Sequence, residues 1–328
     1  MASQRNFRRH VAPHSELSRP GMVQVSVVIT TFNLSHYLAR AIESVKANTV
    51  QPLEIVVVDD GSRDHLSEEI CGRYQGVRYF RQMNQGVSVA RNKGAAMARA
   101  DWVIFVDADD WLLPNAIEEL ATAAAQSPGV GFVIGRGERR SADPSFVPFK
   151  SPVVVQTGDP YKDLAVQNTE WHPAQVLFNK ARVLEDGGFV LKHGAEDFEV
   201  LLRLAVRYPY KIVPGVVSVY WQHSMNVTGN PWRQYRSIDL CFRAHREDPK
   251  FFARSRAAFR AAWAKRLDFY GRAILVSGLS EIRKGNQPMK QIRGMGIVAI
   301  RRPPVLAWFF RFLLLLVIRR FSSHAKSA

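Results

Sequence analysis

The stretch at residues 102–111, WVIFVDADDW, decides the fold, because an apolar run ends there in three carboxylates. A short apolar run with β-branched residues predicts a strand that is buried on both faces. Side chains alternate along an extended chain, so Asp107 and Asp109 should project on one side at the carboxyl end of this strand. Mg²⁺ or Mn²⁺, which binds one or two carboxylates together with substrate phosphates, would offset their repulsion. The alternative is an acidic turn before a helix that begins at Pro114.

Strands and helices alternate on both sides of this stretch. Apolar runs at 23–31, 53–58, 77–80 and 130–134 predict further strands, and residues with helical spacing separate them. This alternation predicts parallel pairing with right-handed crossovers, which is an α/β fold with a doubly wound, mostly parallel sheet. Ligands bind beyond the carboxyl ends of the strands in such sheets. The residues expected at that edge are Thr30, Asp59, Asp60, Asp107 and Asp109.

The pattern loosens after the strand at 130–134. Residues 135–175 are rich in Gly, Pro, Ser and charged side chains, and we expect a long loop region over the site with little secondary structure. Glu196 and Asp197 then begin an amphipathic helix. The helix dipole favours acids in a first turn, so this position alone also allows a purely structural role.

The chain beyond residue 231 has a different composition. Helices rich in Ala, Arg and aromatic residues are expected at 232–246 and 250–276, as a basic helical extension of the fold. Residues 250–328 contain 17 Lys and Arg but only two acidic residues, whereas the whole chain has a net charge of +16. The basic character therefore belongs to the C-terminal quarter, where an anionic partner is expected.

The last apolar run, 305–318, is flanked by arginines and contains Arg311. It is too short to span a bilayer as a helix, and it is more typical of an interfacial helix on an anionic membrane surface. Trp308, Phe309 and Phe310 would then face the acyl chains. The alternative is a terminal helix packed on the protein's own core. The apolar run favours lipid over nucleic acid, so no nucleic-acid partner is expected.

Four parts of the chain follow from these patterns: a flexible basic arm at 1–22, a catalytic domain at 23–230, the basic helical extension at 231–302 and a membrane-associating tail at 303–328. The arm lacks the apolar segment of a secretory signal. We therefore expect a cytoplasmic, peripheral protein on the inner face of the cell membrane.

Several phosphate-binding and hydrolytic motifs are absent from the sequence. No Gly-x-Gly-x-x-Gly follows a predicted strand, and there is no Gly-x-x-x-x-Gly-Lys-[Ser/Thr] loop. There is also no His-Glu-x-x-His motif and no Gly-x-Ser-x-Gly elbow. A diphosphate would therefore be held through a metal ion.

Five motifs, in order and spacing, resemble those of glycosyltransferase family 2. They are VSVVITTFN at 25–33, VDDGSRD at 58–64, the NQG and ARNKG pieces within 84–94, VDADD at 106–110, and Glu196-Asp197. The resemblance covers about residues 23–225. It implies the GT-A fold and a metal-assisted, inverting transfer of a sugar from a nucleotide sugar.

The resemblance also implies roles for the donor half of the site. The nucleotide sugar, with a UDP-sugar as the first candidate, would be bound by Thr30, Asp59, Asp60, Arg91 and Asp107. Thr30 and Asp59 would hold the nucleobase, and Asp107 the ribose.

The remaining roles concern the reacting groups. Asp109 would hold the metal, Mn²⁺ or Mg²⁺, that bridges the diphosphate. Asp197 would be the general base on the acceptor hydroxyl, and Glu196 would position the acceptor, which is a glycan or a lipid-linked molecule. His223 and Ser224 match a less regular family feature near the diphosphate.

Processive polysaccharide synthases of this family carry Gln-x-x-Arg-Trp after the base, and this chain does not. The resemblance therefore implies a non-processive enzyme. Two other functions stay open at this point. One is a nucleotidyltransferase, which shares the sheet and the metal carboxylates; the other is a catalytically silent, membrane-associated scaffold of the same fold.

Overall fold

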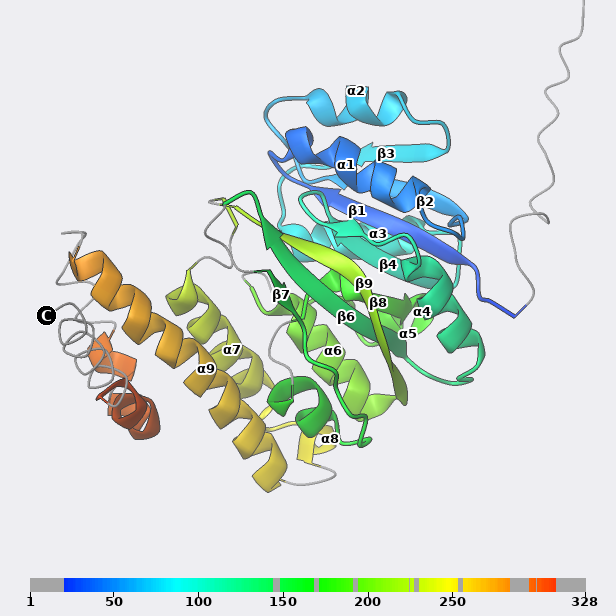
Figure 1. Ribbon diagram of the computed structural model, residues 1–328. Coiled ribbons are helices and arrows are strands. Elements are labelled where there is room, and N and C mark those ends of the chain that lie inside the picture. Colours follow the sequence, from blue (N-terminus) through cyan, green and yellow to red (C-terminus); the bar gives the residue numbers. More distant parts are fainter. Residues whose placement is uncertain are drawn as a thin grey trace, which may run out of the picture.

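The computed structural model describes residues 21–143, 148–167, 171–190, 194–223, 225–226, 230–252, 256–283, 295–298 and 300–310. One mixed sheet forms its centre, with the strand order β3-β2-β1-β4-β8-β6-β9-β5 and with β7 beside β6. An apolar core lies on each face of the sheet. Helices α1, α2 and α4 cover one face, and α3, α5 and α6 cover the other (Figure 1).

The first half of the sheet is parallel, as the alternating pattern predicted. Strand β1 pairs with β2 and β4, and β2 pairs with β3, all in parallel register. The elements are β1 (Val25–Thr31), α1 (Ser35–Lys46), β2 (Glu54–Asp59), α2 (Leu66–Gly72), β3 (Val77–Arg81), α3 (Val87–Met97) and β4 (Trp102–Asp107). The predicted α/β class with a mostly parallel sheet is thus confirmed.

Helix α3 lies unusually close to β1. A Cβ atom on Gly94 would lie 2.3 Å from Cγ1 of Val28, so only glycine allows this approach. The close contact fixes the height of α3 above the sheet, and α3 carries Arg91 one turn earlier.

The second half of the sheet is mixed. Strand β8 pairs antiparallel with β4 and β6, β5 antiparallel with β9, and β9 parallel with β6. The elements are β5 (Trp111–Leu112), α4 (Ala116–Ala125), β6 (Phe132–Ser141), β7 (Phe149–Lys150), a π-helical turn η2 (Tyr161–Val166), a 3₁₀ turn η3 (Pro173–Gln175), β8 (Val176–Asn179), α5 (Lys180–Glu185), α6 (Glu196–Arg207) and β9 (Tyr210–Gln222).

The expectation of a loop with little secondary structure over residues 135–175 is corrected here. Strand β6 continues to Ser141, because its outer part pairs with β9 as far as Gln222. Sequence periodicity within the segment gave no sign of this distant partner.

The C-terminal extension is helical, with α7 (Pro231–His245), α8 (Pro249–Phe252) and α9 (Arg256–Arg283). Helices α7 and α9 pack against each other beside α6 (Figure 1). Helical residues at 295–298 and 300–310 pack on α9, and a nitrogen of the Arg302 guanidinium lies 2.7 Å from Asp268 Oδ1.

The residues of this last segment that were predicted to face lipid differ in how far they are exposed. Phe309 is only 6% exposed and belongs to the core, whereas Phe310 is 61% exposed. The expectation that Phe309 faces acyl chains is therefore wrong, because α9 covers it. None of the described helices is long and apolar enough to cross a membrane. The rest of the predicted tail, 311–328, and most of the predicted arm, 1–20, lie outside the described residues.

Candidate active site

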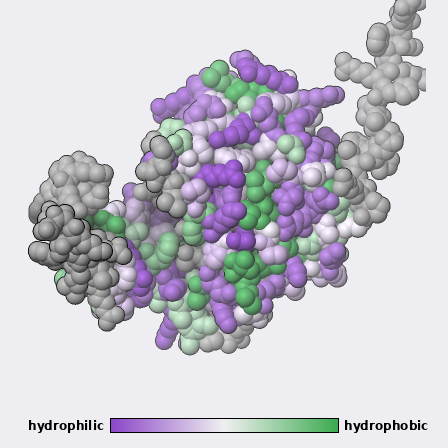
Figure 2. Space-filling model, in the orientation of Figure 1, coloured by the Kyte–Doolittle hydropathy of each residue, from purple (hydrophilic) through white to green (hydrophobic). Residues whose placement is uncertain are grey.

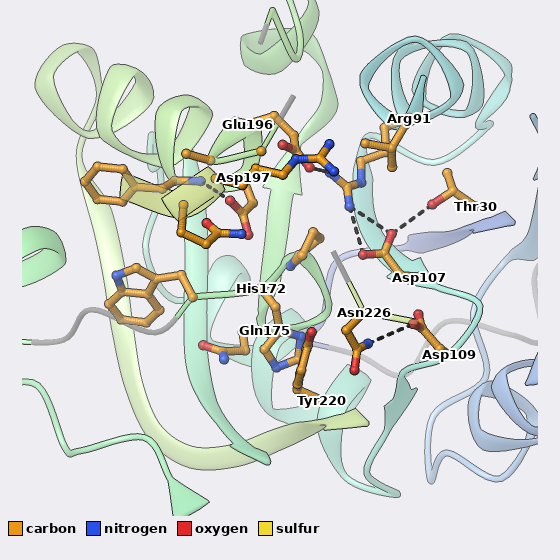
Figure 3. Close-up of a pocket in the computed structure, with 18 of the residues that line it drawn as sticks. Thr30, Arg91, Asp107, Asp109, His172, Gln175, Glu196, Asp197, Tyr220 and Asn226 are labelled. Carbon is orange, nitrogen blue, oxygen red and sulfur yellow. Dashed lines mark hydrogen bonds and ion pairs between the residues drawn. The ribbon is translucent and has the colours of Figure 1, made fainter. Parts of the chain in front are cut away.

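A pocket of about 900 Å³ opens at the carboxyl ends of β1 and β4. Residues from the parallel half of the sheet line one side of it, and residues from α6, α7 and α9 line the other. The predicted site residues among its lining are Thr30, Asp60, Arg91, Asp107, Asp109, Glu196 and Asp197. Seven of the predicted residues are thus brought into one pocket, and most of them are labelled in Figure 3.

Arg91 links the carboxylate of Asp107 to Glu196 at the start of α6. Its Nη2 atom lies 2.8 and 2.9 Å from the two carboxylate oxygens of Asp107, and its Nη1 atom lies 3.2 Å from Oε1 of Glu196 (Figure 3). Thr30 Oγ1 also donates to Asp107, at 2.9 Å. Arg91 is 2% exposed, and the carboxylates of Asp107 and Glu196 keep its pKa above the ordinary value despite burial. The ion pairs hold α3, β4 and α6 in one arrangement.

Asp109 contacts a histidine that follows β9, in the second half of the sheet. Nε2 of His223 lies 2.9 Å from Asp109 Oδ2, and Nδ2 of Asn226 donates to the same oxygen at 3.3 Å. The structure therefore brings the predicted His223 to the predicted metal ligand. Ser224, the other residue of that prediction, lies outside the described residues.

Arg40 of α1 holds the backbone of Asp109 in place. Its Nη2 atom donates to the backbone oxygen of Asp109 at 2.8 Å. Its guanidinium lies 4.0 Å from the ring centroid of Trp111 and 4.8 Å from that of Trp221. This cation–π stack joins α1, β5 and β9, and so holds Asp109 against the strand that leads to His223.

Burial and mutual repulsion raise the pKa of two acids in this cluster. The pKa of Asp109 is raised mainly by burial and then by the charge of Asp107. The pKa of Asp110 is raised well above its ordinary value by burial and then by Asp109 and Asp107. A cation bound here would favour the charged form of the carboxylates.

The side chains at this corner fit a divalent metal that is bound together with a substrate. Among the described residues there is no cluster of three or more His, Cys, Asp or Glu side chains that would hold an ion alone. Asp109, which lines the pocket, and His223, which contacts Asp109, instead offer one carboxylate and one imidazole at one corner. Mg²⁺ and Mn²⁺ are commonly held by one or two protein ligands plus water and phosphate oxygens.

Asp197 lies in the first turn of α6, where its carboxylate faces the pocket (Figure 3). Oδ1 accepts a hydrogen bond of 2.7 Å from the backbone N–H of Phe198. Burial, and then the charge of Glu196, raise the pKa of Asp197 to about 7. A carboxylate with a pKa near neutrality is suited to take up a proton during a reaction.

The start of α6 is a strained turn. Ala195, which precedes the helix, has a φ of 58°, a conformation that is uncommon for a residue with a side chain. Glu196 follows, and among the described residues its Oε2 atom has no hydrogen-bond partner. That oxygen lines the pocket beside Asp197 and is free to accept a hydrogen bond from a ligand.

Buried ion pairs anchor the remainder of α6. Nε of Arg203 lies 2.7 Å from Glu199 Oε1, and its Nη1 lies 2.7 Å from Asp186 Oδ2. In the segment between α5 and α6, the backbone of Phe189 exchanges two hydrogen bonds with Asn92, at 2.8 and 3.0 Å. These contacts fix the segment between α5 and α6 against α3, the helix that carries Arg91.

The two acids after β2 have different surroundings. Asp59 is fully buried, where it accepts from the backbone N–H of Ser62 at 2.7 Å and from the Tyr79 hydroxyl at 2.9 Å, and it does not line the pocket. Asp60 does line the pocket and accepts from the backbone N–H of Gly86 at 2.8 Å. The structure therefore places Asp60, and not Asp59, in the lining of the pocket.

The C-terminal extension forms the opposite wall. Gln234 and Ile238 of α7 and Phe269 of α9 line the pocket. The guanidinium of Arg266 lies 3.8 Å from the ring centroid of Phe198, the residue after Asp197. The extension is therefore part of the site and not an appendage.

Four pocket or support residues were not predicted: Arg40, His172, Gln175 and Asn226. Asn226 follows the predicted His223 closely, so the turn after β9 was a usable signal. Arg40 is spaced as an outer-face residue of α1, and His172 and Gln175 lie in the segment expected to be a loop. No local pattern marks these three.

The fold is shared with known glycosyltransferases. The mannosyltransferase PcManGT from Pyrobaculum calidifontis, solved with GDP-Man and Mn²⁺, is 20% identical with a TM-score of 0.56, over 88% of this chain and 84% of that one. Staphylococcus aureus TarS 1–349, solved with UDP-GlcNAc, is 17% identical with a TM-score of 0.55, over 85% and 92%. The class of the fold is thus that of the GT-A glycosyltransferases.

The sequence comparison also points to glycosyltransferases. Residues 26–179, a little under half of the chain, match the model of glycosyl transferase family 2. An uncharacterized glycosyltransferase of Haemophilus influenzae is 24% identical over 57% of this chain and 65% of its own length. Glycosyltransferase GlyA of Streptococcus pneumoniae is 37% identical over 30% of this chain and 14% of its own length. The chain thus covers less than two thirds of these relatives.

Proposed function

We propose that the protein transfers a sugar from a nucleotide sugar to a hydroxyl group of a glycan or lipid-linked acceptor, with inversion at the anomeric carbon. The observation that carries this proposal is that Asp109, which His223 contacts, and Asp197 both line a single pocket. A leaving group stabilised by a cation and a base on the acceptor side are the two requirements of a single displacement. Relatives solved with UDP-GlcNAc and with GDP-Man support a nucleotide-sugar donor.

The donor half of the pocket is assigned as follows. Asp60 and Thr30 contact the nucleoside, and Asp107, held by Arg91, contacts the ribose. Asp59 acts indirectly, because it is fully buried outside the pocket lining, where it shapes the turn after β2. A UDP-sugar is the first candidate, and a GDP-sugar is the second.

Asp109 and His223 would hold a divalent metal on the diphosphate. When bound, the metal would supply positive charge to the departing diphosphate. Arg91 acts through Asp107 and Glu196, to which its Nη2 and Nη1 atoms donate.

Asp197 is the base of the proposed reaction. It takes the proton of the acceptor hydroxyl while that oxygen forms a bond to the anomeric carbon. The bond between this carbon and the diphosphate oxygen breaks, and its electron pair leaves with the nucleoside diphosphate. Glu196 Oε2, which has no partner among the described residues, accepts a hydrogen bond from the acceptor and orients it.

The deciding experiment is calorimetric titration of UDP and of GDP into the full chain, with Mn²⁺ and with EDTA, followed by a hydrolysis and transfer assay with the matching sugar nucleotides. Asp197→Asn should bind the donor as the wild type does but transfer no sugar. Folded wild-type protein that binds neither nucleotide in Mn²⁺, or Asp197→Asn with full transfer activity, would contradict the proposal.

We also propose that the basic C-terminal end binds the anionic inner face of the cell membrane. Hydrophilic residues cover most of the face shown in Figure 2, so that face offers few contacts to acyl chains. At the C-terminal end, Ile300 and Phe310 are exposed beside an exposed Arg301. Sedimentation with phosphatidylglycerol vesicles but not with phosphatidylcholine vesicles, weakened by salt, is the expected result. Equal sedimentation with both would contradict the proposal.

A further inference from the structure

The floor of the pocket is built by two polar side chains that the proposed reaction does not yet use. His172 and Gln175 flank the 3₁₀ turn η3, and both line the pocket. In Figure 3 they lie together with Tyr220 across the hollow from Arg91, with Asp197 and Asn226 at its sides.

Both side chains are buried with polar atoms that lack a partner. His172 is 8% exposed and Gln175 is 2% exposed. Within the part of the chain that the structure describes, Nδ1 of His172 and Oε1 of Gln175 make no hydrogen bond. A buried polar atom without a partner costs free energy, about 1–3 kcal/mol, so at the wall of a pocket it marks a place where a ligand, a water molecule or an ion would supply the missing bond.

The strand behind these residues is shaped to admit them. A Cβ atom on Gly137 of β6 would lie 2.3 Å from Nε2 of Gln175 and 2.6 Å from Nε2 of His172. Gly137 also follows a register irregularity in the pairing of β6 with β9. Irregularities of this kind re-aim side chains next to functional sites. The two side chains therefore occupy space that a larger residue at position 137 would close.

Their position is on the donor side of the pocket. His172 Nδ1 lies 3.6 Å from Oδ2 of Asp110, the neighbour of the proposed metal ligand Asp109, and His172 Nε2 lies 3.3 Å from Ser218 Oγ. A donor sugar is attached directly to the diphosphate, so it must lie next to this corner. The opposite wall of the pocket, which we assign to the acceptor and call the acceptor wall, is formed by α7 and α9.

The chemistry of the pair is that of a neutral hydrogen-bonding surface. Gln175 carries no charge, and burial lowers the pKa of His172 to about 4, so its imidazole is neutral at pH 7. A neutral imidazole and an amide each offer both a donor and an acceptor. Sugar hydroxyl and acetamido groups need this combination, whereas a sugar carboxylate would meet the acids at positions 107, 109 and 197.

We propose that His172 and Gln175 hydrogen-bond the hydroxyl or acetamido groups of the donor's sugar, and that this sugar is uncharged. This inference rests on the proposed transferase function. It assigns the choice of sugar to η3 and β6, outside the acidic motifs that hold the nucleotide and the metal.

The test compares nucleotides with sugar nucleotides by calorimetry on the full chain in Mn²⁺, without acceptor. The probes are UDP, UDP-glucose, UDP-N-acetylglucosamine, UDP-glucuronate, GDP and GDP-mannose. The wild type should bind one uncharged sugar nucleotide more tightly than its bare nucleotide. Gln175→Met, which keeps the volume, should lower that sugar-dependent gain by about tenfold while the affinity for the bare nucleotide stays unchanged.

The same variant separates ligand recognition from a structural role. Removal of an unpartnered buried polar atom should leave the melting temperature of Gln175→Met equal to or above that of the wild type. Gln126→Met, at an exposed position outside the pocket, is the control and should change nothing. His172→Phe should act as Gln175→Met does; if it fails to fold, Gln175→Met alone decides.

Four results would overturn the inference. The first three are a full sugar-dependent gain in Gln175→Met, an equal loss of bare-nucleotide affinity in that variant, and tighter binding of UDP-glucuronate than of every uncharged sugar nucleotide. A wild type that binds UDP or GDP but gains nothing from any sugar also overturns it, and leaves the nucleotide site standing. A wild type that binds no nucleotide removes the proposed function itself.

Discussion

Asp109 and His223 meet at 2.9 Å, although one follows β4 in the middle of the sheet and the other follows β9 beyond the antiparallel strands. In the proposed function, the imidazole that follows β9 would join the carboxylate as a second ligand of the metal at this corner. We expect His223→Ala to weaken Mn²⁺-dependent nucleotide binding by about tenfold or more, and Asp109→Asn to weaken it further. Calorimetry with UDP or GDP measures both.

The control for this pair is Asp101→Asn, an exposed acid at the opposite end of β4. It should leave nucleotide affinity unchanged. Unaltered Mn²⁺ dependence in His223→Ala would show that the histidine serves only as a hydrogen-bond partner of Asp109.

Arg91 should be a large contributor to stability. Its replacement by Met leaves the buried Glu196 and the partly exposed Asp107 without their cation, and we expect the free energy of unfolding to fall by about 3 kcal/mol. Arg73→Met removes an exposed pair with Glu69 and should cost no more than about 0.5 kcal/mol. Urea denaturation of both variants gives the comparison, and similar losses in the two would refute the bridging role.

Asp197 should give the transfer rate a pH dependence. The base acts as a carboxylate and its pKa is raised to about 7, so the rate should rise as the pH increases from 6 to 8, with a midpoint near 7. Initial rates at saturating donor and acceptor measure this. A rate that is flat over this range would exclude Asp197 as the group that limits it.

The same carboxyl should destabilise the protein at high pH. Its pKa is higher in the folded state than the ordinary value of about 4, so the folded state holds the proton more tightly. Its contribution to the free energy of unfolding is fully present below about pH 4 and is lost as the pH rises to about 7. Asp197→Asn should therefore be more stable than the wild type at pH 8 and show less advantage at pH 5. Melting temperatures at the two pH values test the sign, and an advantage that grows toward low pH would contradict it.

Gly94→Ala should separate α3 from β1. The added methyl group would clash with Val28, and overpacking of this kind costs about 1–3 kcal/mol. Because Arg91 lies one turn earlier, donor affinity should fall as well. Val28→Ala opens the space, so the double variant should lose less than the sum of the two single variants, which a double-mutant cycle measures. Strict additivity would mean that the contact is relieved in another way.

The parallel half of the fold was predictable because each of its strands and helices is marked by a local pattern. The apolar runs that end at Thr31, Asp59 and Asp107 gave both the strands and the edge where the site forms. The mixed half was less predictable. The length of β6 depends on β9, a strand that lies far away in the sequence, so composition alone suggested a loop.

The acids that line the pocket stand in motifs, and so do their partners Thr30 and Arg91, whereas two contacts of Asp109 were not predicted. Asp107, Asp109 and Asp197 stand in recognisable motifs, but the contacts of Arg40 and Asn226 with Asp109 arise only in the folded chain. The two acids at 59 and 60 illustrate the limit of motif reading, since the motif names both. The backbone direction at the end of β2 decides that only the second one lines the pocket.

The pocket wall formed by α7 and α9 comes from a later part of the chain than the motifs of the donor half. The region that matches the family ends at residue 179, whereas Asp197, Gln234 and Phe269 all come later. A genetic exchange with a single junction near residue 230 would deliver a new α7–α9 wall while Asp109, Asp197 and His223 stay in place. On the proposed function, such an exchange would give the cell a new glycosidic linkage from the same activated sugar, with no change in the supply of that sugar.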